Sequence, residues 1–85
     1  MELQYGGLNM YHYTICTEAD RNIFVRQCSA LEKHIPDIKK GQHLNDVDGS
    51  ETQIYELNGK EITVHNSIYI GAVYIDSDIE LDSYF

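Results

Sequence analysis

The sequence lacks most of the features that mark a secreted, membrane-bound or metal-binding protein. It has two cysteines, one proline and no tryptophan, and its longest uncharged, mostly apolar run is the eight-residue segment Ile68–Ile75. Cys16 and Cys28 are too few for a disulfide framework and lack metal-site spacing, so we expect free thiols. Ile68–Ile75 is too short to span a membrane. The first residues have neither the basic nor the apolar region of a signal peptide, which predicts a cytoplasmic protein.

Motifs for catalysis and cofactor binding are absent as well. The histidines show no metal-ligand spacing; they stand at His12, His34, His43 and His65. Asn45–Gly49 resembles part of a calcium loop, but Leu44 occupies the first ligand position, which requires an oxygen. Cys28 falls on an apolar stripe, where a thiol stays protonated, and Cys16 has no base within contact distance on its own strand. We therefore expect no enzyme, no cofactor and no bound metal.

The chain length predicts one small acidic domain, residues 1–85, with a flexible arm at residues 1–9. Met10–Cys16 alternates in polarity, which is typical of a strand. A helix follows, because apolar residues recur at helical spacing: Phe24, Cys28, Leu31 and Ile35. Thr17 can cap this helix, and Pro36 ends it because the residue before a proline is pushed out of the helical region.

The second half predicts an antiparallel meander after a polar loop at residues 39–52. Asn58-Gly59 is a strong hairpin signal, and it pairs Tyr55 with Ile62 on one buried face. Ile68–Ile75 is apolar on both faces, as expected of a strand in the middle of a sheet. The expected fold is α+β, with one α-helix packed on a mostly antiparallel four-stranded sheet in the chain order β-α-β-β-β.

Charge is the most informative feature of the chain. There are 14 carboxylates and 6 basic side chains, and residues 44–85 carry nine of the carboxylates and one lysine, which accounts for the whole net charge of −8. The tail carboxylates alternate along the chain: Asp76, Asp78, Glu80 and Asp82. In a strand they would form a row on one face, spaced by about 6.6–6.8 Å. Ser77-x-x-Glu80 also fits a capping box that would start a short terminal helix, but the unbroken alternation favours a strand.

Such a row predicts either gatekeepers beside an apolar strand or a binding surface. Four carboxylates exceed what gatekeeping requires, so we favour a binding surface. Tyrosine supports it, because seven of 85 residues are Tyr, which is enriched at interface hot spots. The charge attracts a basic protein and repels nucleic acid and anionic membranes. The predicted partner-binding residues are the four tail carboxylates, Tyr74 and Tyr84 at their two ends, and Glu56 and Glu61 nearby.

In size, acidity and lack of catalytic motifs, the sequence resembles the small bacterial immunity proteins that neutralise nuclease toxins of the bacteriocin and contact-dependent growth inhibition systems. The resemblance is one of type, and no site residue is taken from it. It implies tight, stoichiometric binding to a basic toxin domain. Three alternatives stay open: a phage-encoded inhibitor of a host nuclease or CRISPR effector by nucleic-acid mimicry, an acidic regulatory interaction module, and a small enzyme whose fold gathers histidines and carboxylates.

Overall fold

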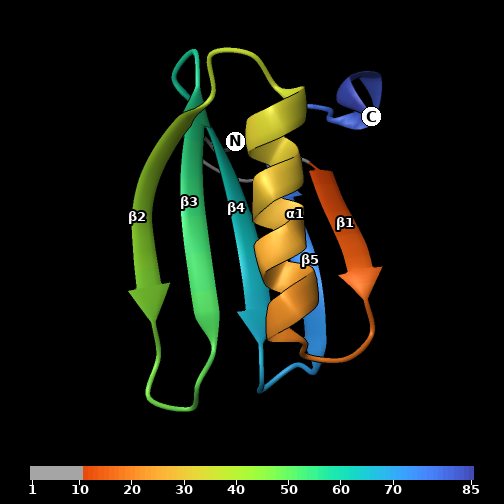
Figure 1. The fold of residues 1–85 in the computed structure, drawn as a ribbon, viewed down its shortest axis with the longest axis vertical. Coiled ribbons are helices and arrows are strands. Elements are labelled where there is room, and N and C mark those ends of the chain that lie inside the picture. The colour runs from red at the N-terminus through yellow and green to blue at the C-terminus, as the bar shows by residue number, and fades with distance from the viewer. Residues whose placement is uncertain (1–10) are drawn as a thin grey trace, which may run out of the picture.

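Residues 11–85, the part of the chain that the computed structural model describes, form a five-stranded antiparallel sheet with one helix across one face (Figure 1). The arm expected at residues 1–9 lies outside this part. The strand order is β1-β5-β4-β3-β2, so the first two strands lie at opposite edges and the helix connects them. The α+β class, with one helix on an antiparallel sheet, is confirmed. Along the chain the elements are β1 (Tyr11–Cys16), α1 (Arg21–His34), β2 (Lys39–Asn45), β3 (Glu51–Leu57), β4 (Lys60–Ser67), β5 (Ala72–Ser77) and the short 3₁₀ helix η2 (Asp82–Tyr84).

The sheet has five strands rather than the expected four, because β2 lies where a polar loop was predicted. All seven residues of β2 are exposed, so no apolar alternation marks it as a strand. A neighbouring side chain holds it: the buried Gln53 amide donates to the carbonyls of Gly41 (3.0 Å) and Gln42 (3.2 Å), where a bulge interrupts the pairing. Gly41 suits this close approach, since a Cβ there would lie 3.0 Å from the Ile54 carbonyl oxygen. Bulges and lysines are typical of a protected edge strand.

The helix α1 begins later than a cap at Thr17 would place it. Asp20 is the N-cap, and its carboxylate accepts a hydrogen bond from the Ile23 amide (3.1 Å). The Asp20 amide donates to the Asn66 side chain (3.0 Å), which fixes the start of the helix against β4. As predicted, the helix ends before Pro36. Within residues 11–85, no helix is long and apolar enough to cross a membrane.

The core lies between α1 and the inner face of the sheet. The hairpin prediction is confirmed: Tyr55 is opposite Ile62, both are fully buried, and the turn at Asn58-Gly59 has left-handed φ angles of 52° and 81°. The Tyr55 hydroxyl donates to the Glu32 carboxylate (2.5 Å) and lies 3.3 Å from the Cys28 carbonyl, so it ties the sheet to the helix. Burial and these contacts raise the pKa of Tyr55, so its phenol stays protonated. The buried apolar cluster comprises Phe24, Cys28, Leu31, Ile35, Tyr55, Leu57, Ile62, Val64, Val73, Ile75 and Leu81.

The apolar run Ile68–Ile75 is a strand only from Ala72 onward. β4 continues through Ser67, and residues 68–71 form a turn that exposes three large side chains, those of Ile68, Tyr69 and Ile70. The Ser67 hydroxyl accepts from the Ile70 amide (3.0 Å), and the Ser67 carbonyl accepts from the amide of Gly71 (2.9 Å), whose φ is 78°. A serine and a left-handed glycine thus reverse the chain where its hydrophobicity predicted a continuous strand. The strand that follows lies inside the sheet, as expected.

The acidic tail is neither the predicted strand nor the alternative helix started by a capping box. β5 ends at Ser77, whose hydroxyl donates to the carbonyl of Ile79 (2.6 Å) and accepts from its amide (3.1 Å). These local bonds compete with strand pairing and turn the chain. Leu81 then packs in the core, and one 3₁₀ turn follows at Asp82–Tyr84.

Replacing Tyr55 with Phe removes one hydroxyl from the core without changing the shape of the side chain. We expect Tyr55→Phe to lower the free energy of unfolding by about 1–2 kcal/mol, because the hydrogen bond to the Glu32 carboxylate is lost. Urea unfolding followed by circular dichroism measures the change. Tyr69→Phe is the matched control, because Tyr69 is 91% exposed and its hydroxyl should not affect stability. Equal stability of the two variants would show that the buried hydroxyl contributes nothing.

Candidate functional site

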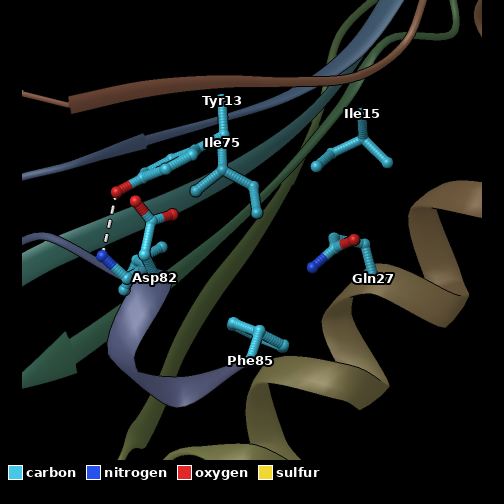
Figure 2. Close-up of a pocket in the computed structure, with 7 residues that line it drawn as sticks. Tyr13, Ile15, Gln27, Ile75, Asp82 and Phe85 are labelled. Carbon is cyan, nitrogen blue, oxygen red and sulfur yellow. Dashed lines mark hydrogen bonds between the residues drawn. The ribbon is translucent and has the colours of Figure 1, made fainter.

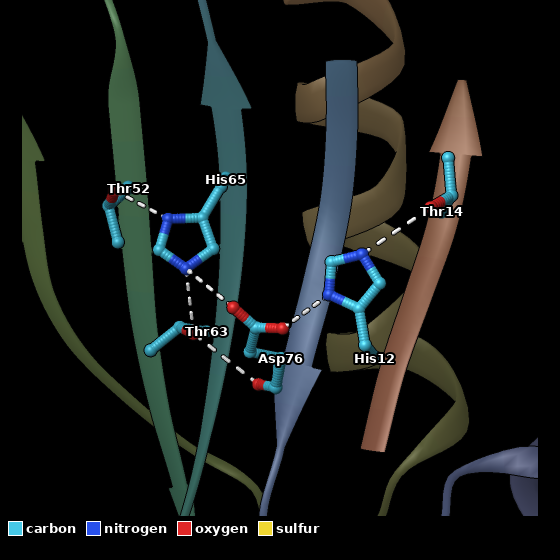
Figure 3. A network of polar contacts seen from close by, with 6 residues as sticks. All are labelled: His12, Thr14, Thr52, Thr63, His65 and Asp76. Carbon is cyan, nitrogen blue, oxygen red and sulfur yellow. Dashed lines mark hydrogen bonds and ion pairs between the residues drawn. The ribbon is translucent and has the colours of Figure 1, made fainter. Parts of the chain in front are cut away.

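Within residues 11–85, no second layer covers the face of the sheet turned away from α1, and we call it the open face. Successive side chains of a strand point to opposite faces of the sheet, so those that alternate with core residues lie on the open face. His12 and His65 lie on this face, because each alternates with core-facing neighbours along its strand. At the centre lie His12 and Thr14 of β1, Tyr74 and Asp76 of β5, Thr63 and His65 of β4, and Thr52 of β3, most of them visible in Figure 3.

Three carboxylates from neighbouring strands lie in a row across one end of the open face, and we call them the carboxylate row. Glu56 on β3 is opposite Glu61 on β4, and both side chains are exposed. Asp78 directly follows β5, and both its amide and its carboxylate bond the backbone of Glu61, at 3.0 Å each. Neighbouring strands are about 4.8 Å apart, so this row is tighter than the one predicted along the tail. The acidic surface therefore runs across the strands and not along one of them.

The remaining tail residues leave the open face. The Leu81 amide donates to the Tyr13 hydroxyl (2.9 Å), which draws the tail to the helix side of β1. There Asp82 lines a mostly apolar cleft of about 230 Å³, together with residues of β1, α1 and the C-terminus (Figure 2). Tyr84 packs against the core, and Glu80 is exposed on the segment between. The prediction of Asp76, Asp78, Glu80 and Asp82 as one row on a strand is thus wrong, because the chain reverses after β5.

Asp76 links the two histidines of the open face. Its Oδ1 lies 2.6 Å from Nδ1 of His12, and its Oδ2 lies 3.7 Å from Nε2 of His65 (Figure 3). Asp76 is directly opposite His12 in the β1–β5 register, so backbone pairing sets the first contact. The two residues are 64 positions apart in the chain, and no spacing in the sequence indicates that they meet.

Hydrogen bonds fix the tautomer of His65. The Thr63 hydroxyl donates to the Asp76 carbonyl (3.3 Å), so its oxygen accepts a hydrogen bond from the Nε2–H group of His65 (3.0 Å). Nδ1 of His65 then accepts from the Thr52 hydroxyl (3.0 Å). The ring also stacks on Tyr74, with ring centroids 4.7 Å apart. Burial lowers the pKa of His65 and outweighs the opposing effect of the Asp76 carboxylate, so His65 is neutral at pH 7.

The contact between Asp76 and His12 has the geometry of a general base, but its setting does not favour catalysis. Nδ1 of His12 faces the carboxylate, and Nε2 lies 3.4 Å from the Thr14 hydroxyl. The His12 side chain is 58% exposed on an edge strand, where water has free access. Burial raises the pKa of the Cys28 thiol, which keeps it protonated. In the described part of the chain, no three His, Cys, Asp or Glu side chains are placed to hold a metal ion.

Ion pairing leaves unbalanced negative charge on the open face. On the helix side, two ion pairs neutralise carboxylates: Arg21 with Glu51 (3.2 Å) and Lys40 with Glu32 (3.4 Å). Among residues 11–85, no lysine or arginine pairs with Glu56, Glu61 or Asp76. Lys39 is opposite Glu56 in the β2–β3 register but forms no ion pair with it. The open face therefore presents a negative field to solvent.

Because burial lowers the pKa of His65, the unfolded chain binds its proton more tightly than the folded protein does. Stability from this group is fully present above the ordinary histidine pKa of 6.5 and is lost as the pH falls from there toward the lower folded-state value. We expect His65→Gln to flatten the fall in stability between about pH 7 and 5, measured as the midpoint of urea unfolding. His34→Gln, at an exposed position, is the matched control. Identical slopes in the two variants would contradict a neutral, partly buried His65.

The open face brings together five of the residues predicted to bind a partner: Glu56, Glu61, Tyr74, Asp76 and Asp78. It adds His12 and His65, whose contacts with Asp76 depend on strand register. The geometry is that of a hydrogen-bonded acidic surface without an enclosed reaction site. No protein-family model, curated protein or solved structure matches the chain, so its function is inferred from this surface.

Proposed function

We propose that this protein is a stoichiometric inhibitor that binds a basic nuclease toxin domain, as do the immunity proteins that it resembles. One observation supports the proposal above the others: negative charge collects on the open face, where Glu56 and Glu61 lie opposite each other and neither pairs with a lysine or arginine of residues 11–85. On the helix side, Arg21 and Lys40 are instead paired with carboxylates within the molecule. The inhibitor acts in the cytoplasm and is not an enzyme.

Carboxylates on an open strand surface suit a partner that binds phosphates. In the complex they take positions that nucleic-acid phosphates would occupy, and the lysines and arginines of the toxin domain meet them. Opposite charge also speeds the encounter, and steered association reaches about 10⁸–10⁹ M⁻¹s⁻¹ at low salt. Tyr74 lies between the rings of His65 and His12, at centroid distances of 4.7 and 5.2 Å, and adds an aromatic side chain to this surface. The same charge disfavours direct binding of nucleic acid or anionic lipid.

Three other functions make different predictions. A phage-encoded inhibitor of a host nuclease or CRISPR effector would use the same surface, and its neighbouring genes would be phage genes. An acidic regulatory module would bind its partner without steep dependence on salt. One contact favours a small enzyme, the general-base geometry of His12 with Asp76. Turnover of a hydrolysable ester that is lost in His12→Ala would support that enzyme.

Sequencing the genes on either side tests the proposal, because we expect one of them to encode a basic C-terminal domain. Co-expression of that domain with this protein is the next step. We expect this domain to be toxic alone, harmless in the presence of the protein, and purified with it as a one-to-one complex. Raising the salt concentration should weaken the complex steeply, because exposed charges are screened. Metabolic genes on both sides, or a complex that forms equally at low and high salt, would contradict an electrostatic toxin inhibitor.

Charge reversal in the carboxylate row should slow association with that toxin domain. Glu56→Lys combined with Glu61→Lys reverses two exposed charges and leaves the core untouched. We expect the association rate at low salt to fall at least about tenfold, because the steering field is reversed. Stopped-flow fluorescence measures this rate.

Glu80→Lys combined with Asp82→Lys is the matched control. It changes the net charge by the same amount, but on the tail, which turns away from the open face after β5. Its association rate should fall much less. Equal effects of the two pairs would show that net charge, rather than the open face, governs the encounter. An unchanged rate in Glu56→Lys/Glu61→Lys would remove both residues from the interface.

Tyr74→Ala should act mainly on dissociation of the complex. The lost aromatic contact is worth about 2 kcal/mol at a hot spot, which corresponds to a roughly thirtyfold higher off-rate in surface plasmon resonance. Tyr74→Phe is the control, because it keeps the ring that stacks on His65. Its off-rate should stay close to that of the wild type. If all three proteins dissociate at the same rate, Tyr74 lies outside the interface.

A further inference from the structure

Two adjacent loops lie at one end of the sheet, the lower end in Figure 1, and both expose large apolar side chains. Val47 of the β2–β3 loop is 103% exposed, and in the β4–β5 turn Tyr69 is 91%, Ile70 62% and Ile68 48% exposed. Turns ordinarily carry Gly, Asn, Asp or Ser. Apolar side chains of this size have a favourable hydrophobic free energy only when another surface removes them from water. We call Val47, Ile68, Tyr69 and Ile70, with the flanking Asp46 and Asp48, the apolar tip.

Hydrogen bonds hold the two loops of the apolar tip together. Ser50 links them, because its hydroxyl accepts from the Ile68 amide (2.8 Å) and its carbonyl accepts from the Asp46 amide (2.8 Å). Within the β4–β5 turn, the Ile70 amide donates to the Ser67 hydroxyl (3.0 Å). The apolar side chains therefore project from an ordered backbone, so little conformational entropy is lost when a partner covers them.

The charge of the apolar tip restricts what can cover it. Asp46 and Asp48 flank Val47, and their carboxylates accept from the amides of Val47 (2.7 Å) and Ser50 (2.9 Å) respectively. The hydrogen bond from the Ser50 amide lowers the pKa of Asp48, which stays ionised. A second copy of this chain, with its net charge of −8, would bring like charges together, and anionic lipid would be repelled. A basic protein segment with apolar side chains is complementary to both features.

A recess joins the apolar tip to the open face. It is open to solvent, has a volume of about 190 Å³, and is lined by Asp46, Asp48, Thr52, His65, Tyr69 and Tyr74, among others. Two carboxylates and two tyrosine rings suit a lysine or arginine side chain, through charge and cation–π contact. The apolar tip is thus continuous with the surface that carries the proposed function.

We propose that the apolar tip anchors the interface by binding a segment of the basic partner in which an aliphatic or aromatic side chain stands beside Arg or Lys. The apolar side chain packs on Val47, Tyr69 and Ile70, and the cation enters the recess beside Asp46 and Asp48. This inference rests on the proposed function and deepens it. The anchor controls how long the complex lasts, whereas the carboxylate row at the opposite end of the sheet controls how fast it forms.

Surface plasmon resonance with the toxin domain of the adjacent gene tests the anchor. Tyr69→Ser combined with Ile70→Ser should leave the association rate within about twofold and raise the dissociation rate roughly thirtyfold. Val25→Ser combined with Phe85→Ser is the matched control, because these apolar residues are 42% and 59% exposed and lie elsewhere. It should dissociate like the wild type. A wild-type dissociation rate in Tyr69→Ser/Ile70→Ser would overturn the anchor and leave the proposed function standing.

A phage-displayed library of random peptides tests the apolar tip without the toxin domain. Peptides that bind the wild type but not Tyr69→Ser/Ile70→Ser should combine Arg or Lys with aliphatic or aromatic residues. Failure to select such peptides would overturn the anchor, whatever the adjacent gene encodes. Selection of such peptides without any complex with the toxin domain would count against the proposed function alone. A wild-type dimer that becomes a monomer on the same two substitutions would identify a second copy as the occupant and also overturn the anchor.

Discussion

One helix covers one face of the sheet, and the rest of the structure depends on that constraint. α1 has 14 residues, is about 21 Å long, and runs along the strands rather than across them (Figure 1). It therefore shields one face and leaves the other in water. The central strands must then alternate, with Tyr55, Ile62 and similar side chains beneath the helix and polar ones such as Thr52 and His65 outside. The candidate site is a direct consequence, because only the open face can present side chains from several strands at once.

The same constraint explains why the tail folds back. Ile79 packs against the core and Leu81 is buried in it, and both follow the reversal at Ser77. Burying a side chain such as Leu81 stabilises the fold by about 1.5–3 kcal/mol. A straight strand would instead have placed like charges side by side along one face. The fold therefore buries the apolar residues of the tail in the core, and the carboxylates between them no longer lie on one face.

Features set by neighbouring residues were predictable from the sequence, and those set by single long-range contacts were not. The hairpin at Asn58-Gly59 follows from turn geometry, and the buried helix stripe follows from its period. The bulge of strand β2 is bonded by the Gln53 side chain from 12 residues away, which no pattern indicates. The end of β5 is an exception, because the local bond of the Ser77 hydroxyl to Ile79 interrupts an alternation that predicted a strand. The contact of His12 with Asp76 requires the register of β1 on β5, which strand order along the chain does not specify. The sequence therefore predicted that the site is acidic, but it did not predict that the carboxylates lie across neighbouring strands rather than along one strand.

The distance between the two ends of the open face determines which kind of partner fits it. The carboxylate row lies beside the β3–β4 hairpin and the apolar tip lies at the other end of β4, whose eight residues span about 27 Å. A small ligand cannot touch both ends, whereas a protein interface of about 800 Å² per partner can. Between them, Asp76 is already bonded to His12, and His65 is neutral. Under the proposed function, cations of the partner are therefore directed to the two ends, with long-range attraction governing the encounter and desolvated contact governing dissociation.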